Sequence, residues 1–176
     1  YLAEDWEVSN EAKTYEFTLK DATFQNGDSI TAADVKFSFE FLQENGGELQ
    51  GGVNPGFESI ETPDDSTVVI RFAESNPAFL NDTIVKVGIL NEDVWADAAE
   101  NPANFSPPMG TASGPFATTE FESERLLVLE THGGHPMAPD PSEFDTLEFR
   151  GFSDENTMVQ ALGAGEIMTI ASASFS

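Results

Sequence analysis

The chain lacks cysteine and has few basic residues. None of its 176 residues is cysteine, which excludes disulfides, thiolate nucleophiles and cysteine-based zinc sites. Only 7 lysines and arginines stand against 32 aspartates and glutamates, so the formal net charge is −25 at pH 7. Such an excess of negative charge repels phosphate, and we therefore expect no nucleic acid partner and no anionic membrane surface. The chain has two histidines and no cysteine. A Ser-His-Asp or Cys-His catalytic arrangement therefore has few residues from which it could form.

Long apolar segments are absent as well. No run approaches the ~20 residues that a membrane-spanning helix needs, and the chain does not begin with a signal-peptide pattern. Apolar mass is nevertheless available, because 39% of the residues are hydrophobic and 15 are phenylalanine. We therefore expect a folded domain rather than an acidic disordered tail. Because the sequence starts at Tyr1 inside what reads as regular structure, we expect a piece of a longer protein.

The carboxylates are dense enough to repel one another in dilute buffer. A compact chain of this mass exposes about 8,400 Å², so the carboxylates lie about 16 Å apart on average. That spacing is about two Debye lengths at 0.15 M salt and about five at 1 M. Repulsion is therefore felt in ordinary buffer and largely screened in brine, and the composition indicates a salt-adapted protein. An acidic calcium-binding domain is the alternative, but the turn over residues 21–32 departs from the EF-hand spacing, with Asn26 at the glycine position and Ala32 at the glutamate position.

The first third of the chain predicts a β-hairpin followed by a capped helix. Apolar and polar residues alternate over 6–8 and 15–19, around a break at residues 9–12. After a turn at Asn26-Gly27-Asp28, Thr31 and Asp34 have the spacing of a capping box. The apolar stripe that follows predicts a helix ending at Gly46-Gly47.

The remainder predicts short elements on both sides of one strong break. The expected elements are strands near 60 and 68–72, helical turns over 77–84, a helix over 92–99 capped by Asn91, a hairpin of 116–121 and 125–131, a strand at 147–149, a helix from Asp154 to Gly163-Ala164-Gly165, and a buried strand over 167–171. The proline- and glycine-rich stretch from Pro107 to Pro115 predicts a subdomain boundary.

The two histidines are the one candidate metal site. His132 and His135 flank a pair of glycines, and two imidazoles can ligate a metal. The neighbouring Glu130 and Asp140 are not held on any obvious helix face, so we expect both histidines to be loop side chains. A metal receptor or a metal-dependent enzyme using His132 and His135 remains the alternative function.

Several motifs occur in an order and spacing that resemble one family. They are Leu2-Ala3-Glu4-Asp5-Trp6, Thr14-Tyr15-Glu16-Phe17-Thr18-Leu19-Lys20, Phe24-Gln25-Asn26-Gly27, Thr31-Ala32-Ala33-Asp34-Val35, Ser113-Gly114-Pro115-Phe116, Leu147-Glu148-Phe149-Arg150 and the segment 161–167. Together they resemble the family 5 extracellular solute-binding proteins, the dipeptide, oligopeptide and nickel binders of ABC importers. Two departures stand out. Ala112 replaces a usual glycine, and the segment 132–136 replaces an Asn-Pro-x-Tyr-Trp-like one.

The resemblance implies a fold and a division of the chain. The fold is a mixed α/β (α+β), periplasmic-binding-protein-like II architecture, of which this chain is part of lobe I only. Residues 1–112 are expected to form a partial small subdomain and residues 113–176 the beginning of the main sheet subdomain, with lobe II absent. We then expect exposed apolar surface on residues 113–176, where missing strands of the sheet should pair.

The resemblance also implies a function. The chain is expected to be a fragment of an extracellular, cell-surface anchored lipoprotein that captures peptides or similar small solutes between two lobes and delivers them to ABC transporter permease subunits. The acidic composition adds the expectation that this protein is of haloarchaeal type. No enzymatic step and no cofactor are expected, and membrane association is expected only through an anchor outside this segment. Ligand-binding residues stay unassigned, because many of the family's contacts come from the lobe that is not included here.

Overall fold

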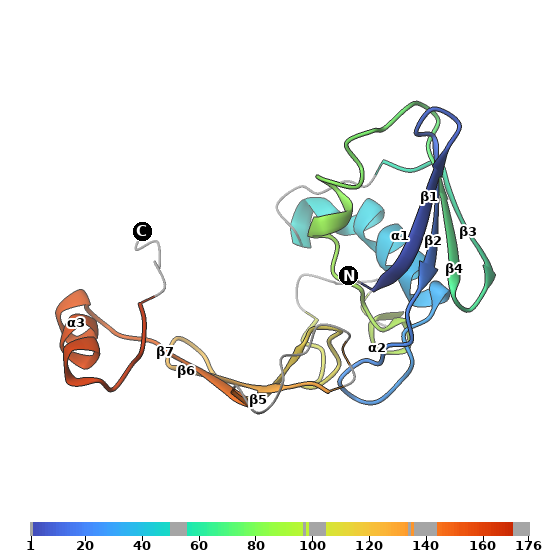
Figure 1. Cartoon of the computed structure of the whole chain (residues 1–176). Coiled ribbons are helices and arrows are strands. Elements are labelled where there is room, and N and C mark those ends of the chain that lie inside the picture. The colour runs from blue at the N-terminus through green and yellow to red at the C-terminus, as the bar shows by residue number, and fades with distance from the viewer. Residues whose placement is uncertain are drawn as a thin grey trace.

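The computed structural model describes residues 2–49, 56–96, 98, 105–133, 135 and 144–170, and they form two β-sheets with helices beside them (Figure 1). The first sheet has the order β1-β2-β4-β3, and the second has the order β5-β6-β7. All of their strand pairs are antiparallel. We call the part from β1 to α2 the four-stranded unit and the part from β5 to α3 the three-stranded unit.

The elements of the four-stranded unit follow the sequence pattern closely. They are β1 (Ala3–Ser9), β2 (Thr14–Leu19), α1 (Ala32–Leu49), β3 (Ser59–Asp64), β4 (Thr67–Arg71), the 3-10 turn η1 (Ile84–Lys86) and α2 (Glu92–Trp95). The break between β1 and β2 closes through Asn10, Glu11 and Ala12, which all have positive φ. The helix α1 lies along one face of the sheet (Figure 1).

The core of the four-stranded unit is aromatic. Phe79 is fully buried, and its ring centroid lies 5.0 Å from that of Tyr15 and 4.9 Å from that of Phe72. Phe39 of α1 joins the same cluster, which also takes in the inward residues of β2 and β4. Burying each such ring stabilises the fold by about 2–3 kcal/mol. The hydroxyl of Tyr15 remains satisfied because it donates to the carbonyl of Asn76 at 2.7 Å.

The three-stranded unit lacks a comparable core. It consists of β5 (Phe116–Glu122), β6 (Leu126–Thr131), β7 (Thr146–Arg150) and α3 (Glu155–Ala164). Phe121, Leu127 and Phe149 are cross-strand partners on one face, yet Phe121 is 62% exposed and Phe149 is 50% exposed. Among the described residues from 105 to 170, only Ala161 is buried. The expected exposed apolar surface is therefore confirmed for the described residues of this unit.

The sequence predicted the starts of two further helices, α2 and α3, from their capping residues, and the structure confirms both starts. The side chain of Asn91 accepts from the backbone N–H of Val94 at the start of α2. The side chain of Asp154 accepts from the backbone N–H of Thr157 at the start of α3, and Gly165 ends that helix in the left-handed conformation. These local hydrogen bonds explain why the sequence placed both helices correctly at their N-termini.

Two expectations, the end of α1 and the strand from residue 167, are wrong. The helix α1 runs through Gly46 and Gly47 to Leu49, because neither glycine adopts the positive φ that would end it. The expected helix over 92–99 begins as predicted, with α2 over Glu92–Trp95 and 3-10 geometry at residues 96 and 98, while residues 97 and 99 lie outside the described residues. Residues 167–170 form no strand, since none of the described strands pairs with them, and residue 171 of that prediction lies outside the described residues. No helix in the described ranges is long and apolar enough to cross a membrane.

Candidate functional site

The two units meet at a tight turn formed by residues 22–30. Inside the turn, the backbone N–H of Phe24 donates to the carbonyl of Asp28 at 2.8 Å, and that of Ile30 donates to the carbonyl of Ala22 at 2.9 Å. Gly27 has a φ of 92°, a conformation that glycine adopts without steric penalty. The turn is thus closed by its own backbone hydrogen bonds.

Further contacts anchor this turn to the four-stranded unit. Ala22, Phe24 and Ile30 are buried together as a small apolar cluster, against which Leu2 and Ile89 pack. On the outer side, the amide of Asn91 donates to Asp28 Oδ2 at 3.2 Å. Within the turn, the amide of Asn26 donates to the same oxygen at 2.6 Å. Apolar packing on one side and the hydrogen bond from Asn91 on the other leave the turn little freedom to move relative to this unit.

Gln25 connects the turn by hydrogen bonds to the segment that leads into β5. Its backbone N–H donates to the carbonyl of Ala112 at 3.0 Å, and its side-chain Nε2 donates to the carbonyl of Phe116 at 2.5 Å. One residue therefore bridges two carbonyls that lie four positions apart. The structure in this way brings together two of the motifs noted in the sequence, Phe24-Gln25-Asn26-Gly27 and Ser113-Gly114-Pro115-Phe116.

His132 makes a second contact with the same turn. Its Nε2 lies 3.0 Å from the carbonyl oxygen of Thr23 and 3.4 Å from the Thr23 hydroxyl. A carbonyl oxygen can only accept, so the pairing assigns the proton to Nε2. The backbone N–H of His132 also donates to the carbonyl of Pro115 at 2.8 Å. The expectation of a plain loop side chain is therefore incomplete for His132, because its ring is hydrogen-bonded across the junction.

One more hydrogen bond completes this region, which we call the junction: residues 22–30, residues 112–116, Ile89 and His132. The hydroxyl of Ser113 donates to the carbonyl of Ile89 at 2.9 Å. The three shortest side-chain hydrogen bonds across the junction thus end on main-chain carbonyls. A carbonyl held in a backbone keeps its position, so these bonds are suited to orienting the two units.

His135 does not form a metal site with the described residues. Its backbone N–H donates to the carbonyl of His132 at 3.2 Å. Burial lowers the pKa of His135 below its usual 6.5, and the nearby His132 lowers this pKa further. Within the described part of the chain, no group of three or more His, Cys, Asp or Glu side chains is arranged to hold a metal ion. The alternative built on His132 and His135 thus gains no support here, and Asp140 lies outside the described residues.

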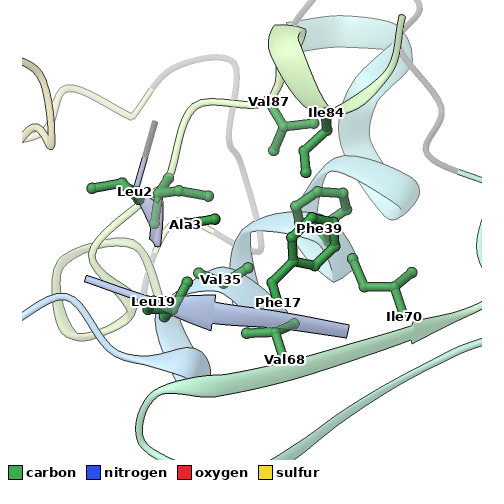
Figure 2. Close-up of a pocket in the computed structure, with 11 residues that line it drawn as sticks. Leu2, Ala3, Phe17, Leu19, Val35, Phe39, Val68, Ile70, Ile84 and Val87 are labelled. Atoms are coloured by element: carbon green, nitrogen blue, oxygen red, sulfur yellow. The ribbon is translucent and has the colours of Figure 1, made fainter. Parts of the chain in front are cut away.

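An apolar pocket of about 130 Å³ lies inside the four-stranded unit (Figure 2). Phe17, Phe39 and Val68 line it from the sheet and α1, and Ile84 and Val87 line it from the segment around η1. All eleven residues that line this pocket are apolar. A ligand site needs some polar side chains to orient its ligand, so this pocket does not present the chemistry of a peptide site.

The chain matches a known family over its whole length. The sequence profile described as "Bacterial extracellular solute-binding proteins, family 5 Middle" matches residues 1–176. The chain belongs to this family. Its mixed α/β architecture is that of the periplasmic binding proteins.

Two relatives illustrate how much of a family member is present here. A protein of Brucella ovis, named as an ABC transporter peptide-binding protein, is 34% identical over 177 residues that cover 94% of this chain and 32% of that protein. The Escherichia coli protein DdpA, named for D,D-dipeptide binding in the periplasm, is 33% identical over 144 residues, or 77% of this chain and 27% of that protein. This family 5 chain spans about a third of the length of such relatives.

Solved structures agree with this placement. The binding protein AgaA from A. tumefaciens R10, in complex with agropinic acid, superposes with a TM-score of 0.79 at 30% identity and covers 94% of this chain and 33% of that chain. NikA from Brucella suis, in complex with Fe(III)-EDTA, superposes with a TM-score of 0.80 at 22% identity and covers 95% of this chain and 33% of that chain. At that identity the second likeness concerns the fold alone.

The family motifs could be found from the sequence, but the junction could not. The motif at Phe24–Gly27 and the motif at Ser113–Phe116 are both visible as short patterns. That Gln25 donates to Phe116 at the end of the second motif and to Ala112 just before it depends on how the two units pack, which no local pattern encodes. The position of His132, beside a glycine pair and close to the end of β6, was the only available signal for its contact with Thr23.

Proposed function

We propose that this chain is part of the extracellular substrate-binding protein of an ABC importer, which captures peptides or similar small solutes between two lobes. The observation that carries the proposal is the family match over residues 1–176, together with relatives that are named for peptide binding. Affinity in such a protein arises from enclosing the solute as the lobes close. The bound solute would then be released to permease subunits in the membrane.

The chain would supply part of lobe I. In this proposal residues 1–112 form the partial small subdomain and residues 113–176 begin the main sheet subdomain, while lobe II lies in another part of the protein. One observation supports an incomplete second subdomain. The exposed apolar side chains of β5 and β7 suit a sheet that further strands and helices complete.

The cycle proposed for the intact protein contains no bond-making step. The protein would bind, close, dock and release, so neither a catalytic residue nor a cofactor is needed. We place it outside the cell and tethered to the cell surface as a lipoprotein, with the anchor outside these 176 residues. The support for this location is the family itself, whose members are described as extracellular.

The host would be a salt-adapted cell, which we propose to be a haloarchaeon. The support is the net charge of −25 and the way in which the charges are arranged. Five ion pairs occur among the described residues, and each joins exposed side chains no more than ten positions apart. Such exposed pairs contribute little to stability, and with 7 basic residues against 32 acidic ones most carboxylates depend on salt for screening. The relatives named above are bacterial, and the archaeal source rests on charge alone.

Native mass spectrometry of the full-length protein tests the proposed function. The protein would be purified gently, and the molecules that stay bound would be released by denaturation and identified by their mass. Short peptides, present at a fixed ratio to protein and absent after the protein is unfolded, dialysed and refolded, are the expected result. A protein that repeatedly carries no solute, and that gains no thermal stability from a mixture of di- to pentapeptides, would contradict the proposal.

A further inference from the structure

We propose that Gln25 and His132 form a two-point clamp that sets the orientation of the four-stranded unit relative to the three-stranded unit. The first point is the pair of hydrogen bonds from Gln25 to Ala112 and Phe116. The second is the hydrogen bond from His132 Nε2 to the carbonyl of Thr23. The two points act on Thr23 and Gln25 of the same turn, from the end of the hairpin where the start of β5 pairs with the end of β6.

The clamp matters because packing between helices and strands does little to fix the orientation of the two units. The helix and strand pairs with extensive packing all lie within one unit: strands with their neighbours in the same sheet, and α1 with β3, β4 and α2. Figure 1 shows the three-stranded unit reaching away from the four-stranded unit, with α3 at its far end. The described connections across the junction are loop contacts. In such a joint, a few directional hydrogen bonds can decide the angle.

The turn is suited to act as the fixed half of the clamp. Its own backbone bonds close it, and the buried side chain of Phe24 holds it to the four-stranded unit. The acceptors on the other half are the carbonyls of Ala112 and Phe116, and Phe116 is the first residue of β5. Each bond therefore joins a rigid turn to the base of a strand. Rotation of one unit against the other would break both points together.

The length of the His132 side chain and the position of its donor nitrogen distinguish it from other polar side chains at this position. Its Nε2 is three bonds from Cβ, and it donates to a carbonyl that can only accept. The Nε2 of glutamine is also three bonds from Cβ, whereas the Nδ2 of asparagine is only two. Glutamine can therefore replace the donor in place, and asparagine falls short of the carbonyl. This difference separates a positioning role for the ring nitrogen from a general demand for a polar side chain.

The consequence for solute capture rests on the proposed function. If the chain is part of lobe I, its two units form neighbouring parts of one wall of the solute cleft. The clamp would hold that wall in one shape, so that lobe closure meets a surface formed in advance. Pre-organisation of this kind raises affinity because less conformational freedom is lost on binding.

Distance measurements between two spin labels test the clamp without any solute. The 176 residues contain no cysteine, so labels can be placed at Gln43→Cys on α1 and Glu120→Cys on β5, both of which are exposed positions. Any cysteine of the full-length protein outside this segment would be replaced by serine. Double electron–electron resonance would then be recorded for the doubly labelled protein and for His132→Gln, His132→Asn and Gln25→Met variants of it.

The clamp predicts a single narrow distance for the parent and for His132→Gln. The narrow distance is expected to be lost, with a broadened or shifted distribution, in His132→Asn and Gln25→Met. Circular dichroism with unchanged helix and strand content would show that both units remain folded in these two variants. Distributions that are the same in all four proteins would overturn the clamp and assign the orientation to the apolar cluster around Phe24. A positive result in a protein that carries no peptide would leave the clamp standing while the proposed function fails.

Discussion

The carboxylate oxygen Oδ1 of Asp34 accepts a hydrogen bond from the backbone N–H of Glu92 at 3.1 Å, although 58 positions separate the two residues. The other oxygen, Oδ2, accepts from the backbone N–H of Thr31 at 2.9 Å and from its hydroxyl at 2.7 Å. Asp34 thus caps the start of α1 and at the same time satisfies the first N–H of α2. A single buried carboxylate joins two helix N-termini, where negative charge is favourable.

Asp34→Ala is expected to lower the free energy of unfolding by about 2–3 kcal/mol, because donors at both helix starts lose a charged acceptor. Asp34→Asn keeps one oxygen but turns an N–H₂ group toward one set of donors, so an intermediate loss is expected. The measurement is urea unfolding followed by far-UV circular dichroism. The control is Asp93→Asn, which makes the same chemical change at an exposed position in the first turn of α2. Equal losses at Asp34→Asn and Asp93→Asn would contradict the bridging role.

The elements that the sequence predicted well are those whose signals are local. The Thr31–Asp34 capping box, the Asn91 cap and the Asp154 cap each act within a few residues, and the structure confirms all three. The failures depend on distant partners. The expected strand from residue 167 needs a neighbouring strand that the described residues do not provide. The long α1 shows that a glycine pair ends a helix only where the chain needs a left-handed turn.

The segment after β7 approaches the β5–β6 connection so closely that only glycine fits at position 151. A Cβ atom there would lie 1.9 Å from the carbonyl oxygen of Glu124, and the backbone N–H of Gly151 donates to the carbonyl of Arg125 at 2.8 Å. Gly151→Ala is therefore expected to destabilise the three-stranded sheet by about 1–3 kcal/mol, the usual range for overpacking. Amide hydrogen exchange of β5 and β6 would report the change as lower protection.

Gly163→Ala provides the matched control for that substitution. Gly163 lies in the last turn of α3, and a Cβ there would meet no atom within 4 Å. Alanine is favoured over glycine within a helix by at most about 1 kcal/mol. The same chemical change should then raise protection in α3. A Gly151→Ala protein with unchanged exchange in β5 and β6 would show that the close approach relaxes without loss.

The candidate site illustrates a different limit of sequence reasoning. Gln25 and Phe116 each belong to a short motif that can be recognised in the sequence, so each motif could be singled out separately. Their hydrogen bond could not be predicted, because it depends on where the second sheet begins relative to the turn. His132 stands in a glycine-rich stretch whose composition indicates a loop, and its ring finds Thr23 only after both units have folded.

The cap of α3 should lose its contribution in acid. Hydrogen bonds from the backbone N–H and the hydroxyl of Thr157 lower the pKa of Asp154 below its usual 3.8. Because the folded pKa lies below the unfolded one, this group stabilises the helix fully above about pH 4 and stops doing so as the pH falls through the folded pKa. Hydrogen exchange at the Thr157 amide is expected to show falling protection below about pH 4.

Asp154→Asn separates that cap from the general effect of acid. Asparagine caps helices as well as aspartate does but does not titrate. The two proteins should protect the Thr157 amide about equally above about pH 5, and a difference in favour of Asp154→Asn should open as the pH falls below about 4. A difference that remains constant down to pH 2 would contradict the role assigned to the carboxylate.

Glu7 of β1 and Glu16 of β2 are direct cross-strand partners, and both are exposed. Like charges in facing positions destabilise a strand pair, whereas opposite charges contribute about 0.2–1 kcal/mol. Glu7→Lys is therefore expected to stabilise the four-stranded unit at 0.1 M KCl.

Glu4→Lys is the matched control. It makes the same charge change in the same strand, but at a register shift where no β2 residue faces it. Glu7→Lys should exceed Glu4→Lys by about 0.5–1 kcal/mol at low salt, and the excess should largely disappear in 3 M KCl, where screening acts over about 2 Å. Thermal unfolding of the three proteins from 0.1 to 3 M KCl measures both quantities.

The parent protein should also gain stability over this range of salt. A parent unfolding midpoint that does not rise with salt would remove the salt-adapted interpretation. Equal effects of Glu7→Lys and Glu4→Lys would remove only the cross-strand repulsion.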